Sequence, residues 1–262
     1  MTPIANRKKL ANHPITQALC QIRFSTIRDM TTYVPKVQVA LRKDAYRLDM
    51  SGQVQEIVFG PQGPTTRPFE RWEFLNVEKT RSVVLTEQFA AFQTTAYTTF
   101  EDFVPEVIRM MDALAGAGAD VLITRIGLRY VNAIVPSNGK TWRTYLNPSL
   151  HGIQLPSLTG PLTAYHVIGD SAHGRLLARM TQNTECALVP IEMGQQNLAL
   201  QMQPPPSGSI ITLIDIDHFK EWTKDFTEYQ PGAMQQLLWN LKDVAYDVFR
   251  SFVTESAIEE WK

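Results

Sequence analysis

Two arginines in the run of residues 121–135 have the type and spacing of an anion-binding site. Arg125 and Arg129 share one parity, with Gly127 between them. In a strand their side chains therefore point to the same face and start about 13 Å apart. An arginine can hold a phosphate or a carboxylate through two hydrogen bonds, and the glycine leaves a gap without a side chain. This pattern predicts a face that can bind an anionic group.

Arg23 and Arg71, in two other predicted strands, can add to this anion- or partner-binding face. The alternative is structural, because charged residues on antiparallel sheets commonly pair across strands. Under that alternative, Arg125 and Arg129 form ion pairs with carboxylates of neighbouring elements. The candidates for these partners are Glu73, Glu87 and Glu101.

A second motif places Asp215 and Asp217 at alternate positions just before His218. Alternate carboxylates at the end of a strand can hold Mg²⁺ against a triphosphate, and the string Asp-Ile-Asp-His-Phe-Lys is similar to that strand in diguanylate cyclases. The similarity ends after six residues, since neither the following turn nor the catalytic Gly-Gly-Asp/Glu-Glu-Phe hairpin is present. We therefore expect Asp215 and Asp217 to be structural.

Other residue types of catalytic or metal sites occur without the required spacing. Asp170, Ser171 and His173 have the composition of a hydrolase site, but a polar segment between two glycines is typical of a hairpin turn. The histidines include no pair at the i, i+4 spacing of a helical zinc site, and neither cysteine has a second one nearby. We expect no catalytic residues, no metal site and no cofactor, so the sequence favours a protein that is not an enzyme.

The elements that must position these residues follow from hydrophobic periodicity. Alternating apolar residues predict strands at 14–24, 57–59, 71–78, 82–89, 91–97 and 121–135, the last of them the longest and central in its sheet. Apolar residues at helical spacing predict helices at 32–48, from Asp102 to about 115, and at 232–255. A meander of strands is predicted at 162–168, 175–182, 186–193, 197–202 and 209–216.

This order of elements predicts an α+β fold, with mostly antiparallel sheet covered by two long amphipathic helices. The chain divides into an N-terminal α+β half (1–135), an ordered crossover (136–161) rich in proline and glycine, and a C-terminal meander with a long helix (162–262). The pattern leaves open that the two halves are similar, and we expect them to form one compact unit.

Composition narrows the class of protein further. The 262 residues carry 25 Lys and Arg against 26 Asp and Glu, so a diffuse basic field that would attract nucleic acid or anionic lipid is not expected. Cys20 and Cys186 lie far apart and form no disulfide framework. Without a signal-like start or an apolar run of about 18 residues, the sequence predicts a cytoplasmic protein with no membrane span.

Several segments together resemble one family of uncharacterised, sporadically distributed prokaryotic proteins of about 260 residues. The segments are 12–24, 71–74, 103–108, 124–132, 213–217 and 248–252, and Thr-Arg-Ile-Gly-Leu-Arg-Tyr-Val-Asn at 124–132 is the most specific of them. The resemblance implies no reaction and no catalytic residues. Sporadic distribution does imply mobile gene neighbourhoods, such as those of accessory or anti-phage defence modules.

We therefore expect a non-catalytic component of such a module, which binds a ligand or another protein of the same gene cluster. The alternative is a protein that binds or processes nucleic acid through the face that carries Arg125 and Arg129. The sequence leaves the oligomeric state open.

Overall fold

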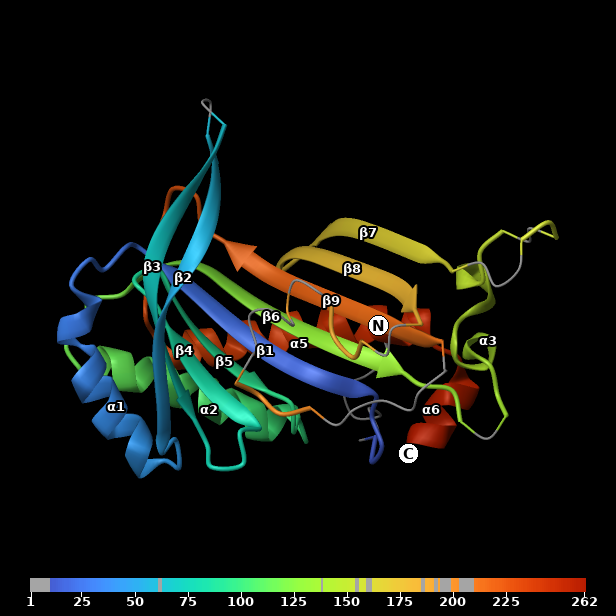
Figure 1. The fold of residues 1–262 in the computed structure, drawn as a ribbon, viewed down its shortest axis with the longest axis horizontal. Coiled ribbons are helices and arrows are strands. Elements are labelled where there is room, and N and C mark those ends of the chain that lie inside the picture. The colour runs from blue at the N-terminus through green and yellow to red at the C-terminus, as the bar shows by residue number, and fades with distance from the viewer. Residues whose placement is uncertain are drawn as a thin grey trace.

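The chain folds around one antiparallel sheet of ten strands. The computed structural model describes residues 10–60, 63–137, 139–153, 156–158, 162–184, 187–190, 193, 199–202 and 210–262, with only the backbone for 54–60 and 63–67. The strand order is β2-β3-β4-β5-β1-β6-β9-β8-β7, and β10 pairs with β6. The predicted α+β class with antiparallel pairing is confirmed (Figure 1).

The strands and helices have the following bounds. The strands are β1 (Ile15–Phe24), β2 (Leu48–Gly60), β3 (Gly63–Leu75), β4 (Arg81–Leu85), β5 (Phe89–Thr94), β6 (Leu122–Ile134), β7 (Ala164–Ser171), β8 (Gly174–Asn183), β9 (Ile211–Glu221) and β10 (Thr227–Glu228). The helices are η2 (Met30–Thr32), α1 (Val34–Lys43), α2 (Phe100–Gly116), α3 (Trp142–Tyr145), η3 (Pro148–Leu150), α5 (Pro231–Phe252) and α6 (Glu255–Trp261).

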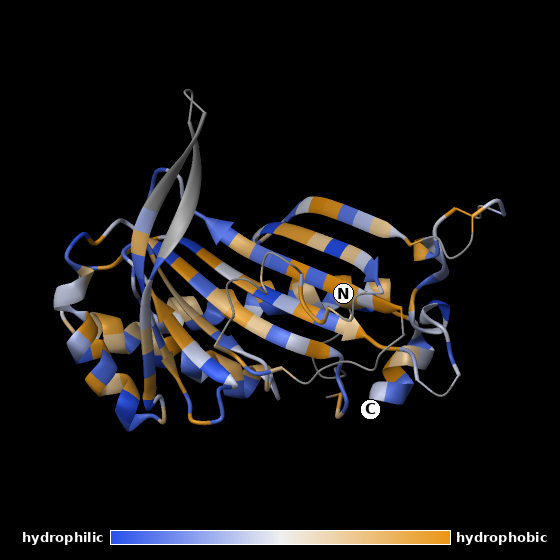
Figure 2. Cartoon of the chain, viewed as in Figure 1, coloured by the Kyte–Doolittle hydropathy of each residue, from blue (hydrophilic) through white to orange (hydrophobic). Residues whose placement is uncertain are grey.

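Strands β1, β6 and β9 form the middle of the sheet, as the long run at 121–135 predicts. Their residues alternate between apolar and polar types, which appears as alternating bands in Figure 2. Cys20, Leu128 and Ile216 lie on the face that packs against the helices and are almost completely buried. Residues of the other parity, including Arg125 and Arg129, therefore point to the opposite face, which we call the open face.

Helices α2 and α5 lie behind the sheet in Figure 1, on the face away from the viewer. In α5 the buried residues recur every three or four positions: Met234, Leu238, Leu241, Ala245, Phe249 and Phe252. This spacing places them along one side of the helix, where they pack on β6, β8 and β9. Helix α2 packs on β5 in the same layer, and α1 packs on α2.

Two helix ends differ from the prediction. Helix α2 begins at Phe100 rather than Asp102, because the Thr99 hydroxyl accepts a hydrogen bond from the Asp102 amide and so caps the first turn. The predicted helix at 232–255 ends at Phe252. Val253 is extended and bridges to Leu146, and a separate helix, α6, then starts behind the side-chain cap of Thr254.

The region between α1 and β4, where strands were predicted at 57–59 and 71–78, also differs from the prediction. Strands β2 and β3 form a hairpin of two 13-residue strands that extends beyond the rest of the sheet (Figure 1). At its base, Leu48 and Met50 are exposed. Beside them in β3, the consecutive residues Phe74 and Leu75 are both buried. Neither strand therefore shows, at its base, the regular alternation of a half-buried strand.

In the part of the C-terminal meander that the structure describes, three of the five predicted strands are present. Residues 187–190 and 199–202 are not in strands, although strands were predicted at 186–193 and 197–202. Val189 and Met193 instead pack on Val131, on the open face of the sheet. They belong to a segment that crosses this face, so their apolar character reflects packing on the sheet and not strand pairing. Cys186 lies outside the described residues, and Cys20 is a buried free thiol.

The predicted crossover at 136–161 docks on the protein where the structure describes it. Helix α3 packs beside α6, and the Tyr145 hydroxyl donates a hydrogen bond to Glu260 at 2.9 Å. Within the described parts of the chain, no helix combines the length and the hydrophobicity needed to cross a membrane.

Candidate functional site

Arg125 and Arg129 lie on the open face of β6, as their shared parity predicts. Arg129 forms a two-pronged ion pair with Asp215 on β9, with Nε–Oδ1 and Nη2–Oδ2 distances of 2.7 and 2.8 Å. Arg179 on β8 also donates to Asp215 Oδ2, at 2.6 Å. The Asp215 side chain is only 4% exposed, so two guanidinium groups balance one buried carboxylate.

Arg125 fills the gap above Gly127 that could have admitted an anion. A Cβ at Gly127 would lie 2.5 Å from Nη1 of Arg125, so the guanidinium lies directly over the glycine backbone. From there Nη2 donates to Asp217 at 3.0 Å, and the guanidinium stacks 4.2 Å from the centre of the Phe219 ring. Arg125 can therefore reach Asp217 because Gly127 has no side chain in the way.

Burial shifts the pKa of both Arg125 and Asp217. It lowers the pKa of Arg125, while the charge of Asp217 raises it and that of Arg23 lowers it. Burial likewise raises the pKa of Asp217, and the Arg125 charge opposes that shift. Asp215 and Asp217 both bind guanidinium groups, so the partners of the two arginines come from β9 and not from Glu73, Glu87 or Glu101.

The other two candidate arginines have different surroundings. Arg23 lies opposite Arg125 in the register of β1 with β6, is exposed, and donates to the Gln21 side chain at 3.0 Å. Arg71 lies on β3 and pairs with Glu73 at 3.0 Å. Three strands separate β3 from β6, a distance of about 19 Å at the usual strand spacing. The structure therefore brings Arg23 to the pair on β6 and leaves Arg71 apart.

The Asp170–Gly174 segment is the hairpin turn between β7 and β8, as expected. Its Ser171 hydroxyl lies 2.8 Å from Nε2 of His218, whose Nδ1 lies 2.8 Å from the backbone carbonyl of Leu241. A carbonyl can only accept, so Nδ1 carries the proton of the neutral ring. The single proton of the Ser171 hydroxyl is shared between Nε2 and the backbone carbonyl of Gly174, which lies 2.9 Å away. His218 is fully buried, and these bonds tie the hairpin to α5.

A pocket of about 440 Å³ lies on the other face of the sheet, between the strands and the helices. Strands β1, β6 and β9 form its floor, α5 one wall, and the segment that leads into α2 another. Its lining is mainly apolar and aromatic: Leu10, Pro14, Ile15, Tyr97, Phe100, Tyr130, Ile216, Ala245, Tyr246 and Phe249. This volume and lining are typical of sites that bind small molecules.

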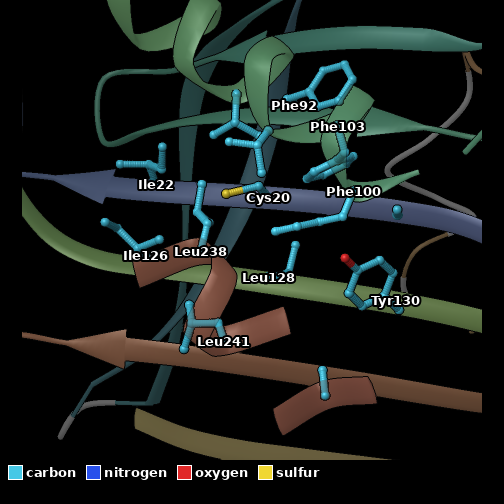
Figure 3. Packing of buried hydrophobic residues seen from close by; sticks show 14 of the residues in the cluster. Cys20, Ile22, Phe92, Phe100, Phe103, Ile126, Leu128, Tyr130, Leu238 and Leu241 are labelled. Atoms are coloured by element: carbon cyan, nitrogen blue, oxygen red, sulfur yellow. The ribbon is translucent and has the colours of Figure 1, made fainter. Parts of the chain in front are cut away.

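Tyr130 supplies the most unusual polar group of this pocket. Its side chain is 8% exposed, and its hydroxyl is buried without a hydrogen-bond partner among the residues that the structure describes. Figure 3 shows Tyr130 at one end of the buried cluster on β6, at the opposite end from Ile126. A buried hydroxyl without a partner costs about 1–3 kcal/mol relative to a satisfied one, so this group is suited to a ligand.

Tyr97 lies against Tyr130, with ring centres 5.7 Å apart and the planes nearly perpendicular. The two hydroxyls are near enough to affect each other's pKa, although they do not meet the geometry of a hydrogen bond. Burial, as the largest cause, raises the pKa of both tyrosines, and the charge of Glu101 raises both further. Both hydroxyls therefore remain protonated at neutral pH and can donate.

Lys242 is the charged residue that α5 contributes to this pocket. Its side chain is 20% exposed and lines the pocket. The ammonium group lies 5.3 to 6.0 Å from the ring centres of Trp239, Tyr246 and Phe100, and 3.4 Å from Asp243. Aromatic rings thus hold this cation at the α5 side of the pocket.

This pocket could not be predicted from the pattern of residues. Tyr130 belongs to the apolar parity of β6 and is therefore indistinguishable from a core residue in the pattern. Its relation to Tyr97 and to α5 depends on contacts between distant segments. No model of a known protein family matches the chain, and no curated protein has a significantly similar sequence.

Proposed function

We propose that this protein is a non-catalytic binding component that takes a small, mainly apolar ligand in the pocket between the sheet, α2 and α5. The observation that carries the proposal is the Tyr130 hydroxyl, which is buried at the pocket without a partner among the described residues. An apolar pocket with a few fixed polar groups is the usual form of a small-molecule site.

The polar groups of the pocket fit binding better than catalysis. They include the hydroxyls of Tyr97 and Tyr130, whose raised pKa values disfavour the phenolate that a general base or nucleophile would need. Nε2 of His13, at the same pocket, lies 3.0 Å from the backbone carbonyl of Tyr97. These groups can orient a ligand through hydrogen bonds.

A fluorescent probe tests this proposal directly. N-phenyl-1-naphthylamine, which is uncharged and emits strongly in apolar surroundings, should bind the wild-type protein. Ala245→Phe should abolish that signal by filling the pocket, whereas Ala233→Phe, at an exposed position of the same helix, should not. Ala245→Leu provides a smaller filling variant if the phenylalanine impairs folding. If a folded variant with a filled pocket binds the probe as well as the wild type does, the probe binds elsewhere on the protein.

The biological setting of the proposal rests on the resemblance to the sporadically distributed prokaryotic family. It supports a cytoplasmic accessory or anti-phage defence module in which another protein of the same gene cluster is the partner. Co-purification of the tagged protein with the products of neighbouring genes tests this part. Recovery of the protein alone, from cells that express the whole cluster, would contradict it.

We infer two similar halves, each covered by one long amphipathic helix, α2 or α5. The boundary that we propose between them lies before β6, and not at residue 135 as the sequence pattern predicted. In support, β1 then starts the first half and pairs with β5, and β6 starts the second half and pairs with β9. The two first strands, β1 and β6, pair with each other at the middle of the sheet.

Nucleic-acid binding through the open face is the second candidate. In its favour, Arg23 is exposed and the Arg179 side chain is 36% exposed, close to Arg125 and Arg129. Against it, Asp215 and Asp217 pair with Arg125, Arg129 and Arg179 and so neutralise two of these three charges. Affinity for single-stranded and duplex probes at two salt concentrations separates the candidates, because phosphate contacts weaken steeply with salt.

A further inference from the structure

We infer that the ligand of the pocket is a neutral, mainly apolar carbonyl compound, such as a ketone, ester or amide, whose oxygen accepts hydrogen bonds from Tyr130 and Tyr97. This inference rests on the proposed function, because it names the class of ligand for the same pocket. Three observations carry it: the unpartnered hydroxyl, the second hydroxyl beside it, and the charges around them.

The hydroxyls of Tyr130 and Tyr97 form a pair of donors at one end of the pocket. Tyr130 is held by β6 and is buried, while Tyr97 packs edge-on against it and its backbone carbonyl contacts His13. Because the two hydroxyls lie near each other without bonding well, one oxygen placed between them can use both donors. A carbonyl oxygen has two lone pairs and can accept both bonds.

The charge near these hydroxyls disfavours a carboxylate at that position. Glu101 lies at the mouth of the pocket, is exposed, and acts electrostatically on both tyrosines. The positive charge of Lys242 is held among the rings of α5 and beside Asp243. A ligand carboxylate between the tyrosines would therefore be repelled by Glu101, whereas an uncharged oxygen would not be.

The rest of the lining favours an apolar body for the ligand. Phe100, Phe249 and Ile216 line the space beyond the tyrosines, and the volume of about 440 Å³ accommodates a molecule with one or two rings or a short acyl chain. Edge-to-face contacts with several aromatic side chains favour a flat ring in particular.

Three naphthalene probes of similar shape test the class of ligand. We expect 2-acetylnaphthalene, a ketone, to bind wild-type protein about fivefold more tightly than 2-ethylnaphthalene, which lacks the oxygen, and more tightly than the carboxylate 2-naphthoate. The difference between ketone and hydrocarbon should fall below twofold in Tyr130→Phe, which removes only the hydroxyl. Tyr165→Phe, which alters a tyrosine outside the pocket, is the matched control and should keep the fivefold difference.

The role of Glu101 is tested with the same probes. Glu101→Gln should narrow the gap between 2-naphthoate and the ketone. Equal binding of the ketone and the hydrocarbon by the wild type, a ketone preference that survives in Tyr130→Phe, or strongest binding by the naphthoate would each overturn the inference. These outcomes leave a binding pocket in place, whereas failure of all three probes to bind would contradict the proposed function as well.

Discussion

The carboxylate of Asp215 is the charged group of the open face that depends most on its partners. It is almost fully buried and accepts hydrogen bonds from Arg129 and Arg179, which come from the strands on either side of β9. A buried charge that loses a partner keeps the cost of its desolvation but loses the compensating attraction. The arginines of this face are therefore expected to contribute measurably to stability.

Arg129→Ala should lower the free energy of unfolding by about 3 kcal/mol, because it removes the two-pronged partner of a buried carboxylate. Arg125→Ala should cost less, about 1–2 kcal/mol, since its partner Asp217 is 26% exposed and can be hydrated. Arg23→Ala, at an exposed position, is the control and should stay within about 0.5 kcal/mol of the wild type. Urea denaturation measures all three. If Arg129→Ala unfolds like the wild type but no longer binds nucleic-acid probes that the wild type binds, the open face is a binding site instead.

The parity of β6 was enough to place Arg125 and Arg129 on one face, but it could not identify their partners. Asp217 lies opposite Arg129 in the strand register, yet Arg129 bonds to Asp215 and Arg125 reaches Asp217 across Gly127. These diagonal contacts depend on the direction in which long side chains lean along the strands. The alternation of residues carries no information about that direction.

His218 gives the fold a dependence on pH. Burial lowers its pKa below the usual value of 6.5, so the folded protein keeps this histidine neutral while the unfolded chain protonates it. The unfolded state then binds more protons below about pH 6.5, and stability falls as the pH decreases through that value. The melting temperature of the wild type should therefore decline between pH 7.5 and 5.5.

His218→Gln should flatten this decline, because the substituted residue does not titrate. His166→Gln is the matched control, since His166 is exposed on β7 and its replacement should leave the decline intact. Melting temperatures across the same pH range measure both variants. An equally steep decline in His218→Gln would assign the pH dependence to other groups.

At the level of elements, the close approach of the β7–β8 turn to β9 depends on Gly174. Its φ is 156°, and a Cβ there would lie 2.1 Å from the backbone carbonyl oxygen of Phe219. Gly174→Ala should therefore destabilise the protein by about 3 kcal/mol, because backbone must move to relieve the overlap. Gly169→Ala, in β7, meets nothing within 4 Å and should be nearly neutral. Equal stability of the two variants in urea denaturation would contradict this account.

Elements with one buried side were predictable, and elements without one were not. Helix α5 buries a residue at every third or fourth position, and both β1 and the middle of β6, from Ile126 to Tyr130, place their apolar residues at alternate positions, so their periods identify them. At the base of the β2–β3 hairpin there is no such period, since β2 leaves Leu48 and Met50 exposed while β3 buries the consecutive residues Phe74 and Leu75. Residues 187–190 are apolar because they cover Val131 and its neighbours, which composition alone does not distinguish from a strand.

At the scale of the whole molecule, the two proposed halves share one sheet and one core. Strands β1 and β6 pair along most of their length, and the main buried cluster contains residues from both sides of that junction. Cys20 and Leu128 face each other across it and are completely buried. Separating the halves would expose both the paired strand edges and this part of the core. We therefore expect the chain to unfold as one cooperative unit, although chains of this length often populate intermediates.

Calorimetry can measure this cooperativity. Unfolding enthalpies near 60 °C are about 0.7 kcal/mol per residue, which corresponds to about 180 kcal/mol for 262 residues. For a single unit the van't Hoff enthalpy should equal this calorimetric value, whereas two independent halves would give a van't Hoff enthalpy about half as large. Leu128→Ala, at the junction, should lower the midpoint of the whole transition without splitting it, because the cavity weakens a contact that both halves use. Two resolved transitions, in the wild type or in this variant, would show that the halves fold independently.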